Sequence, residues 1–223
     1  MTQIKDSKSQ LNQDLFVLSE LGFKRNGFYV EFGACDGLMF SNSFALENEY
    51  GWSGILAEPA RSFKESLIKN RPKSKLDFRC VWLESNKTIT FNEPTEGELS
   101  TINEFSDHDY AYNSALSGKR DNGAKYEVET ISLIDLLNKH EAPKEIDYLS
   151  IDTEGSEFDI LNNFDFDVYD IKIITCEHNW TPYRSKIFDL LQSKGFQRKY
   201  EQHSRWDDWY VKVDEPKKFF YTT

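Results

Sequence analysis

Several features that would assign the chain to a membrane, secreted or nucleic-acid-binding class are missing from its sequence. No apolar run approaches the length of a membrane-spanning helix. The first ten residues, MTQIKDSKSQ, lack the apolar core of a secretory signal peptide. Basic residues are in deficit, 27 against 38 acidic ones, and the net charge is −11. We therefore expect no membrane span. Because neutralising the phosphates of a nucleic acid requires a basic face, we expect no nucleic-acid partner either.

Cysteine is also scarce. Cys35, Cys80 and Cys176 are far apart and odd in number, so they form neither a disulfide framework nor a metal-binding spacing. A reducing, cytoplasmic location is therefore expected. Internal repeats and Pro/Gly-rich linkers are absent, and 39% of the residues are hydrophobic. We expect residues 1–223 to form one folded domain.

The patterns that are present alternate between strand and helix. Helical spacing of leucines predicts an N-terminal helix within an extension of residues 1–26. Buried-strand patterns then alternate with amphipathic segments, which indicates an α/β fold with a mostly parallel sheet and helices on both faces. Two final strand patterns without a helical pattern between them predict an antiparallel hairpin. The main-sheet strands are expected within residues 27–33, 53–59, 75–82, 146–152, 169–179, 196–202 and 207–213.

The middle of the chain departs from this rhythm. Strand patterns at 87–93 and 125–133 flank residues 94–124, which are polar and rich in Ser, Asn, Asp and Gly. A loop of this length inside a domain is typical of a substrate lid or an insertion. Tyr110 and Tyr112 could stack on a sugar face and Arg120 could hold an acid group of the acceptor. A solvated loop is an equally good reading of these three residues.

The first predicted strand ends in the loop FYVEFGACDG, residues 28–37. A dinucleotide-binding loop needs G-x-G-x-x-G to rest a pyrophosphate on a helix N-terminus. Here Cys35 stands at the middle glycine position, and Glu31 and Asp36 flank the loop. Carboxylates repel a pyrophosphate and attract a cation. The loop therefore favours S-adenosylmethionine, which carries a sulfonium and an ammonium.

The second predicted strand ends in Glu58, which is 21 residues after Gly37. An acid at this place can accept hydrogen bonds from ribose hydroxyls. Glu58 therefore predicts a ribose, without choosing between a nicotinamide cofactor and S-adenosylmethionine.

Acidic residues cluster in YLSIDTEGSEFDIL, residues 148–161. Asp152 ends the fourth strand of the main sheet, while Glu154 and Glu157 enter the next helix, where acids also favour the macrodipole. The fifth strand ends in Glu177, His178 and Asn179 at the same sheet edge.

Methyl transfer to an alcohol requires a base or a metal that lowers the hydroxyl pKa. His178 suits the base role, and a structural role for it stays open. Asp152, Glu177 and Asn179 offer the oxygen ligands that Mg²⁺ prefers. These residues leave the choice between base and metal open. The candidate catalytic residues are Asp152, His178 and Glu154.

At these residues the sequence resembles the FkbM family of S-adenosylmethionine-dependent methyltransferases. The segments YVEFGACDGLMFSNSFALE, GWSGILAEP, LSTI, IDTEGSEFDIL, ITCEHN and DDWYV run in family order over nearly the whole chain. The resemblance implies a class I methyltransferase (Rossmann-like) fold, S-adenosylmethionine as cofactor and O-methylation of a sugar, glycan or secondary metabolite. A similarity to metal-dependent O-methyltransferases adds Mg²⁺ as an optional cofactor.

The predicted cofactor-binding residues lie in the glycine loop, just after it, and at the ends of the second and third strands. They are Glu31, Gly33, Ala34, Asp36, Gly37, Asn42, Glu58, Pro59, Cys80 and Val81. Two alternatives stay open: a nicotinamide-dependent oxidoreductase, and a non-catalytic binding module on the same fold. The sequence does not decide whether the chain forms a homo-oligomer.

Overall fold

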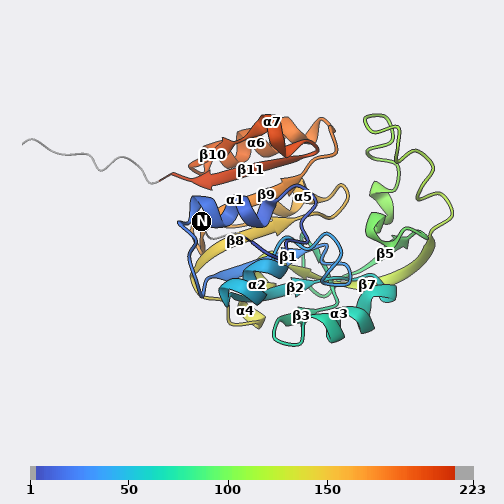
Figure 1. Cartoon of the computed structure of the whole chain (residues 1–223). Helices are drawn as coiled ribbons and strands as arrows, with labels where there is room; N and C mark the ends of the chain where they lie inside the picture. Colours follow the sequence, from blue (N-terminus) through green and yellow to red (C-terminus); the bar gives the residue numbers. More distant parts are fainter. Residues whose placement is uncertain (1–3, 214–223) are drawn as a thin grey trace, which may run out of the picture.

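A seven-stranded sheet forms the centre of the computed structural model, which describes residues 4–213 (Figure 1). Its strand order is β10-β11-β9-β8-β1-β2-β3. Only β11 runs antiparallel to its neighbours, so the predicted mostly parallel sheet and terminal hairpin are confirmed. The strands are β1 (Phe28–Phe32), β2 (Ser53–Ala57), β3 (Lys75–Asp77), β8 (Glu145–Ile151), β9 (Asp170–Glu177), β10 (Phe196–Lys199) and β11 (Asp207–Lys212).

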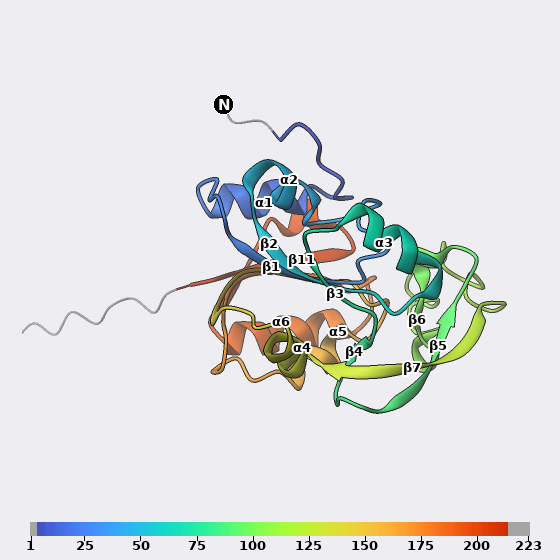
Figure 2. The same ribbon diagram turned by 90° about the horizontal axis from the view of Figure 1, so that it is seen from below.

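Helices cover both faces of this sheet (Figure 2). One face carries α1 (Gln13–Glu20), α2 (Phe44–Tyr50) and α3 (Lys64–Asn70), the last preceded by the 3-10 turn η1 (Arg61–Phe63). The other carries α4 (Leu133–Lys139), α5 (Glu157–Asn162) and α6 (Tyr183–Ser193). The short α7 (Glu201–Ser204) joins β10 to β11. Among residues 4–213, no helix is both long and apolar enough to cross a bilayer.

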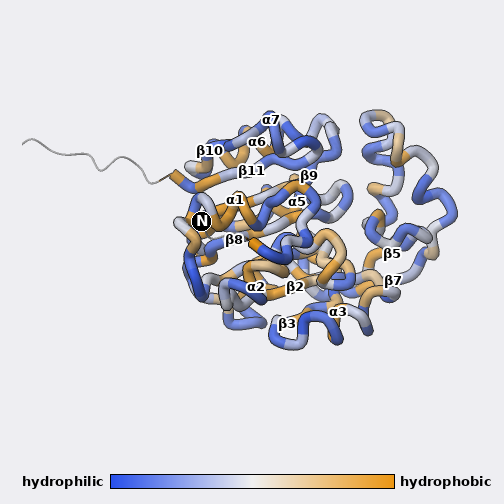
Figure 3. The backbone as a smooth tube through the Cα atoms, in the orientation of Figure 1, coloured by the Kyte–Doolittle hydropathy of each residue, from blue (hydrophilic) through white to orange (hydrophobic). Residues whose placement is uncertain are grey.

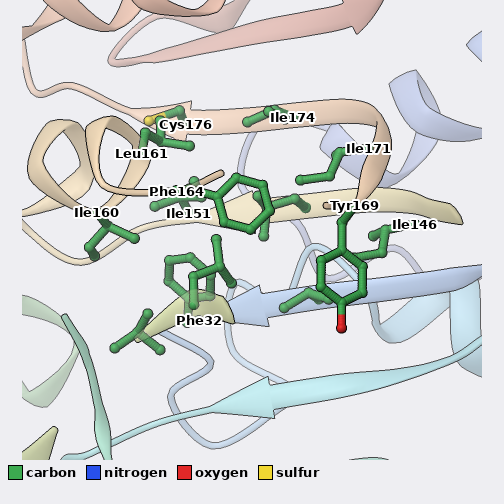
Figure 4. Close-up of a cluster of buried hydrophobic side chains, with 14 of the residues drawn as sticks. Phe32, Ile146, Ile151, Ile160, Leu161, Phe164, Tyr169, Ile171, Ile174 and Cys176 are labelled. Atoms are coloured by element: carbon green, nitrogen blue, oxygen red, sulfur yellow. The ribbon is translucent and has the colours of Figure 1, made fainter. Parts of the chain in front are cut away.

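Alternating side chains along the strands supply two hydrophobic layers. On β1, Val30 and Phe32 pack toward α4, α5 and α6, while Tyr29 packs toward α1, α2 and α3. Figure 4 shows Phe32, Ile151 and Cys176 near the strand ends, with Ile160 and Leu161 of α5 beside them. Hydrophobic residues concentrate in the central strands and α1 (Figure 3). This packing fixes the strand ends, from which the polar side chains of the site extend.

The predicted single strand at 75–82 is wrong. It is two short strands, β3 and β4 (Cys80–Trp82), which belong to different sheets. Asp77 interrupts the strand because its carboxylate accepts hydrogen bonds from the backbone N–H and the guanidinium of Arg79. Lys139 and His140 reach the same buried carboxylate from α4 and its C-terminal end.

A second sheet of four strands, in the order β4-β7-β5-β6, extends beside the main one (Figure 2). The strands predicted at 87–93 and 125–133 are β5 (Thr88–Glu93) and β7 (Ala124–Ser132), which pair antiparallel. Between them, residues 94–124 contain η2 (Gly97–Leu99), β6 (Thr101–Ile102) and η3 (Asn103–Phe105), followed by turns. The second sheet therefore places this segment beside the carboxyl ends of the main-sheet strands.

Candidate active site

A cavity of about 250 Å³ lies at the carboxyl ends of β1, β2, β8 and β9. Its wall also includes residues of β4, the 97–102 stretch and the start of the chain. Seven of the predicted cofactor-binding residues line it: Glu31, Gly33, Asn42, Glu58, Pro59, Cys80 and Val81. Asp152, Glu154, Glu177 and Asn179 line it as well. The structure therefore brings both predicted groups into one cavity.

The glycine loop has a conformation that its sequence requires. Gly33 and Gly37 have φ angles of 79° and 77°, in the left-handed region that favours glycine. A Cβ atom on Gly33 would lie 1.7 Å from the carbonyl oxygen of Asp152. A Cβ atom on Gly37 would lie 2.5 Å from Arg71. Both positions thus require glycine, because other parts of the protein approach the backbone too closely for a side chain.

Glu31 fixes the chain that follows this loop. Its buried carboxylate accepts hydrogen bonds from the Asn42 backbone N–H at 2.7 Å and the Ser41 hydroxyl at 3.1 Å. The Ser43 hydroxyl donates a further hydrogen bond to it. A direct contact between Glu31 and a cofactor stays a prediction, since these partners already engage both carboxylate oxygens.

Three predicted cofactor-binding residues do not line the cavity. Asp36 accepts hydrogen bonds from the backbone N–H groups of Leu38 and Met39, which stabilises the turn. Ala34 and Gly37 are buried within the loop. The geometry of the described residues gives these three no direct role toward a ligand.

Glu58 lies in the wall of the cavity with both oxygens oriented by the backbone. The N–H groups of Cys35 and Ala60 donate to its two oxygens, each at 2.8 Å. Burial raises the pKa of Glu58 to about 7. Each carboxylate oxygen keeps a lone pair, so the side chain can still accept ribose hydroxyls.

Asn42 offers an acceptor atom without a donor. Its Nδ2 donates to the Ser150 hydroxyl at 3.0 Å. Its Oδ1 is buried and has no hydrogen-bond partner within the described chain. Since buried polar atoms are nearly always paired, an ammonium bound in the cavity would satisfy it. This orphaned oxygen fits the ammonium of S-adenosylmethionine, as Glu58 fits its ribose.

Three carboxylates meet at the ends of β8 and β9. Asp152, Glu154 and Glu177 each bring one oxygen within 4.8 Å of the others. Burial raises the pKa of Asp152 to about 7, with a further contribution from Glu157. Burial also raises the pKa of Glu154 and Glu177 well above the ordinary value, and the Asp152 carboxylate adds to both shifts.

Two donors stabilise this cluster. Asn179 Nδ2 donates to Glu177 at 2.9 Å and to Glu154 at 3.1 Å. The fully buried Arg120 donates to Glu154 at 2.6 Å and to Asp109 at 2.7 Å. Arg120 therefore pairs with acids of the protein itself. It links the 94–124 segment to the cluster, a contact that the sequence analysis missed.

His178 does not face the cavity. Its ring lies 3.8 Å from Asp208 on β11, behind the cavity wall. Burial lowers its pKa to about 4, so the ring is neutral near pH 7. Its Nδ1 accepts a hydrogen bond from the Trp180 backbone N–H at 3.0 Å. The lone pair of the neutral imidazole is thus occupied, and this geometry does not support a base role.

The metal-ligand set also differs from the predicted one. Asn179 directs its NH₂ group at the carboxylates, whereas a metal requires its oxygen. The residues that could hold a metal are Asp152, Glu154 and Glu177. Glu154 would then share its carboxylate between the metal and Arg120.

Other cavity residues gave no signal in the sequence. Gln10 comes from the N-terminal extension, where the Ser9 backbone pairs with Phe40. Phe40, 43% exposed, and Trp206, before β11, add aromatic surface. From the 94–124 segment, Leu99 also lines the cavity, whereas Tyr110 and Tyr112 do not.

The comparison with protein families decides between the open alternatives. The methyltransferase FkbM domain model matches residues 31–212, most of the chain. The chain belongs to the FkbM methyltransferase family. It is a SAM-dependent methyltransferase, and the predicted resemblance is confirmed. A comparison with curated protein sequences gives no significant match.

The chain is also similar to solved methyltransferase structures. The METTL16 methyltransferase domain has a TM-score of 0.50 at 11% identity, over 92% of this chain and 68% of that one. A precorrin-6y C5,15-methyltransferase from Geobacter metallireducens GS-15 has a TM-score of 0.48 at 11% identity, over 95% and 91% of the two chains. At 11% identity, the likeness to the METTL16 domain shows the class I methyltransferase fold alone.

Proposed function

We propose that this FkbM protein transfers a methyl group to a hydroxyl of a sugar, glycan or secondary metabolite. The observation that carries the proposal is the carboxylate cluster of Asp152, Glu154 and Glu177, beside the glycine loop. A carboxylate with a pKa near 7 can accept a hydroxyl proton at neutral pH. Asp152 meets this condition, and it replaces His178 as the proposed base.

The cofactor would extend along the cavity from β4 to β8. Val81 and Cys80 offer apolar surface for an adenine, Glu58 accepts the ribose hydroxyls, and Asn42 accepts from the ammonium. When bound, S-adenosylmethionine supplies the methyl group on its sulfonium. Asp152 would then receive the proton of the acceptor hydroxyl, while the hydroxyl oxygen bonds to the methyl carbon and the sulfur–methyl bond breaks to leave the neutral thioether S-adenosylhomocysteine. Phe40 and Trp206 offer aromatic surface on which a sugar ring can stack.

Binding and turnover test the proposal separately. Titration calorimetry should give saturable binding of S-adenosylmethionine, and its absence at high micromolar concentration would refute the cofactor assignment. A mass-spectrometric screen of hydroxyl acceptors, with and without EDTA, should then show a mass gain of one methyl group. Loss of turnover in EDTA that Mg²⁺ restores would assign the cluster to a metal. Methylation of amines or thiols alone would exclude the O-methyl assignment.

Three further properties are proposed with this function. The 94–124 segment would act as a substrate lid, because Leu99 and its neighbours line the cavity. A cytoplasmic location fits the three unpaired, buried cysteines. Size-exclusion chromatography with light scattering would decide whether the chain forms a homo-oligomer.

A further inference from the structure

The charged residues that line the cavity all have the same sign. All six are acidic: Glu31, Glu58, Glu98, Asp152, Glu154 and Glu177. Within the described chain, the cavity lining contains no lysine, arginine or histidine. An anionic group in this cavity would therefore meet several carboxyl groups and no basic side chain of the described lining.

Arg120 is the nearest candidate for an opposite charge, and it is already committed. Its Nε donates to the Leu99 carbonyl at 2.7 Å, and its two terminal nitrogens donate to Asp109 and Glu154. The guanidinium is fully buried behind the cavity wall. To bind an acid group of an acceptor, Arg120 would have to break its hydrogen bonds to two buried carboxylates. Leaving those charges unpaired costs free energy.

The neutral polar groups point to the same conclusion. Asn42, 8% exposed, lines the same cavity as Asp152 and Glu177, and its buried Oδ1 has no hydrogen-bond partner within the described chain. This atom can only accept a hydrogen bond. The NH₂ group of Asn179 donates to Glu154 and Glu177. These two amides therefore give a ligand an acceptor and no free donor.

We propose that the β8–β9 end of the cavity selects for positive charge. The acceptor is then a hydroxyl compound that is neutral or bears a protonated amine. It carries no phosphate, sulfate or carboxylate beside the reacting hydroxyl. The inference rests on the proposed methyl transfer and deepens it, since it names the class of acceptor. The physical reason is that the lining offers an anion no basic side chain, whereas a cation gains Coulomb energy from each carboxylate that is ionised in a poorly solvated site.

Three ligands test the charge selectivity without knowledge of the acceptor. S-adenosylmethionine has a sulfonium, sinefungin has an amine-bearing carbon at the same place, and S-adenosylhomocysteine has a neutral thioether. All three share the adenosine and the amino acid, so their contacts with Glu58 and Asn42 cancel in a ratio. By calorimetry, the two cationic ligands should each bind at least about tenfold more tightly than the neutral one.

Variants identify the carboxylates that cause the preference. Asp152→Asn and Glu177→Gln should each move the affinity ratio toward one, with little change for S-adenosylhomocysteine. Asp159→Asn is the matched control, because it removes a carboxylate of α5 that does not line the cavity. Retained binding of S-adenosylhomocysteine shows that a variant is folded.

The outcomes separate the two proposals. If none of the three ligands binds, the proposed function fails and this inference fails with it. If all three bind with equal affinity, or if Asp152→Asn and Glu177→Gln leave the ratio unchanged, methyl transfer stands and the charge selectivity is refuted. The charge selectivity is also refuted if glucose 6-phosphate or glucuronic acid is methylated faster than glucose or glucosamine. If none of these sugars reacts, the ratio of the affinities for the cationic ligands and S-adenosylhomocysteine decides.

Discussion

Replacing Arg120 by methionine tests the buried ion-pair network most directly. The substitution keeps much of the side-chain volume but removes three hydrogen bonds of 2.6 to 2.7 Å, two of them to carboxylates that are 3% and 8% exposed. Breaking a buried pair by removing one partner costs about 3–5 kcal/mol. Glu154 can escape part of this cost by taking up a proton, because burial already raises its pKa. We therefore expect a loss near the lower limit, about 3 kcal/mol in the free energy of unfolding.

Urea denaturation followed by tryptophan fluorescence measures this loss, and a thermal scan should show a melting temperature lower by about 6–12 °C. Lys119→Met is the matched control, since the adjacent Lys119 pairs with Glu96 at the surface. It should leave stability unchanged. In the double variant Arg120→Met/Glu154→Gln, the losses should be less than additive because one uncompensated carboxylate is gone. Equal stability of Arg120→Met and Lys119→Met would refute the reasoning.

Three further predictions concern the loop, pH and the base. Gly33→Ala should abolish S-adenosylmethionine binding in calorimetry, since its Cβ would clash with the Asp152 carbonyl; normal binding would contradict the contact. The raised pKa of Glu58 means that the folded state holds more protons than the unfolded state between about pH 4.5 and 7, so stability should fall as pH rises through this window. Urea titrations should show a shallower fall for Glu58→Gln, and an unchanged slope would contradict the assignment. Asp152→Asn should lower kcat by about a hundredfold or more, whereas His178→Asn should leave kcat within about threefold; the reverse order would restore His178 as base.

The order of strands and helices could be predicted because it depends on local patterns. Apolar strand runs alternate with helical segments, and a local signal also marks the start of α4, where the Ser132 hydroxyl accepts a hydrogen bond from the Asp135 N–H. The division of residues 75–82 could not be predicted in the same way. The interruption at Asp77 is stabilised by Lys139 and His140, more than 60 residues away. A local pattern cannot report such a contact.

The site was predictable only as far as strand ends are. The carboxyl ends of parallel strands meet at one edge, so Glu58, Asp152 and Glu177 could be placed together. The direction of His178 depends on the turn after β9, where Asn179 and Trp180 have φ angles of 43° and 63°. The partnership of Arg120 and Glu154 joins residues 34 positions apart through a polar segment without a regular pattern.

The missing middle glycine of the first loop has a structural explanation. In a dinucleotide fold, backbone N–H groups of this loop and the following helix are available for a pyrophosphate. Here the N–H of Cys35, at the position of the absent glycine, donates to Glu58 at 2.8 Å, and the residue adopts a φ of 49°. The Cys35 N–H group, which could otherwise donate to a phosphate, therefore donates to the Glu58 carboxylate. The same hydrogen bond orients Glu58 in the cavity, while Gly33 allows the loop to approach Asp152 closely. One turn thus disfavours a phosphate ligand and contacts both the proposed ribose acceptor and the proposed base in the wall of one cavity.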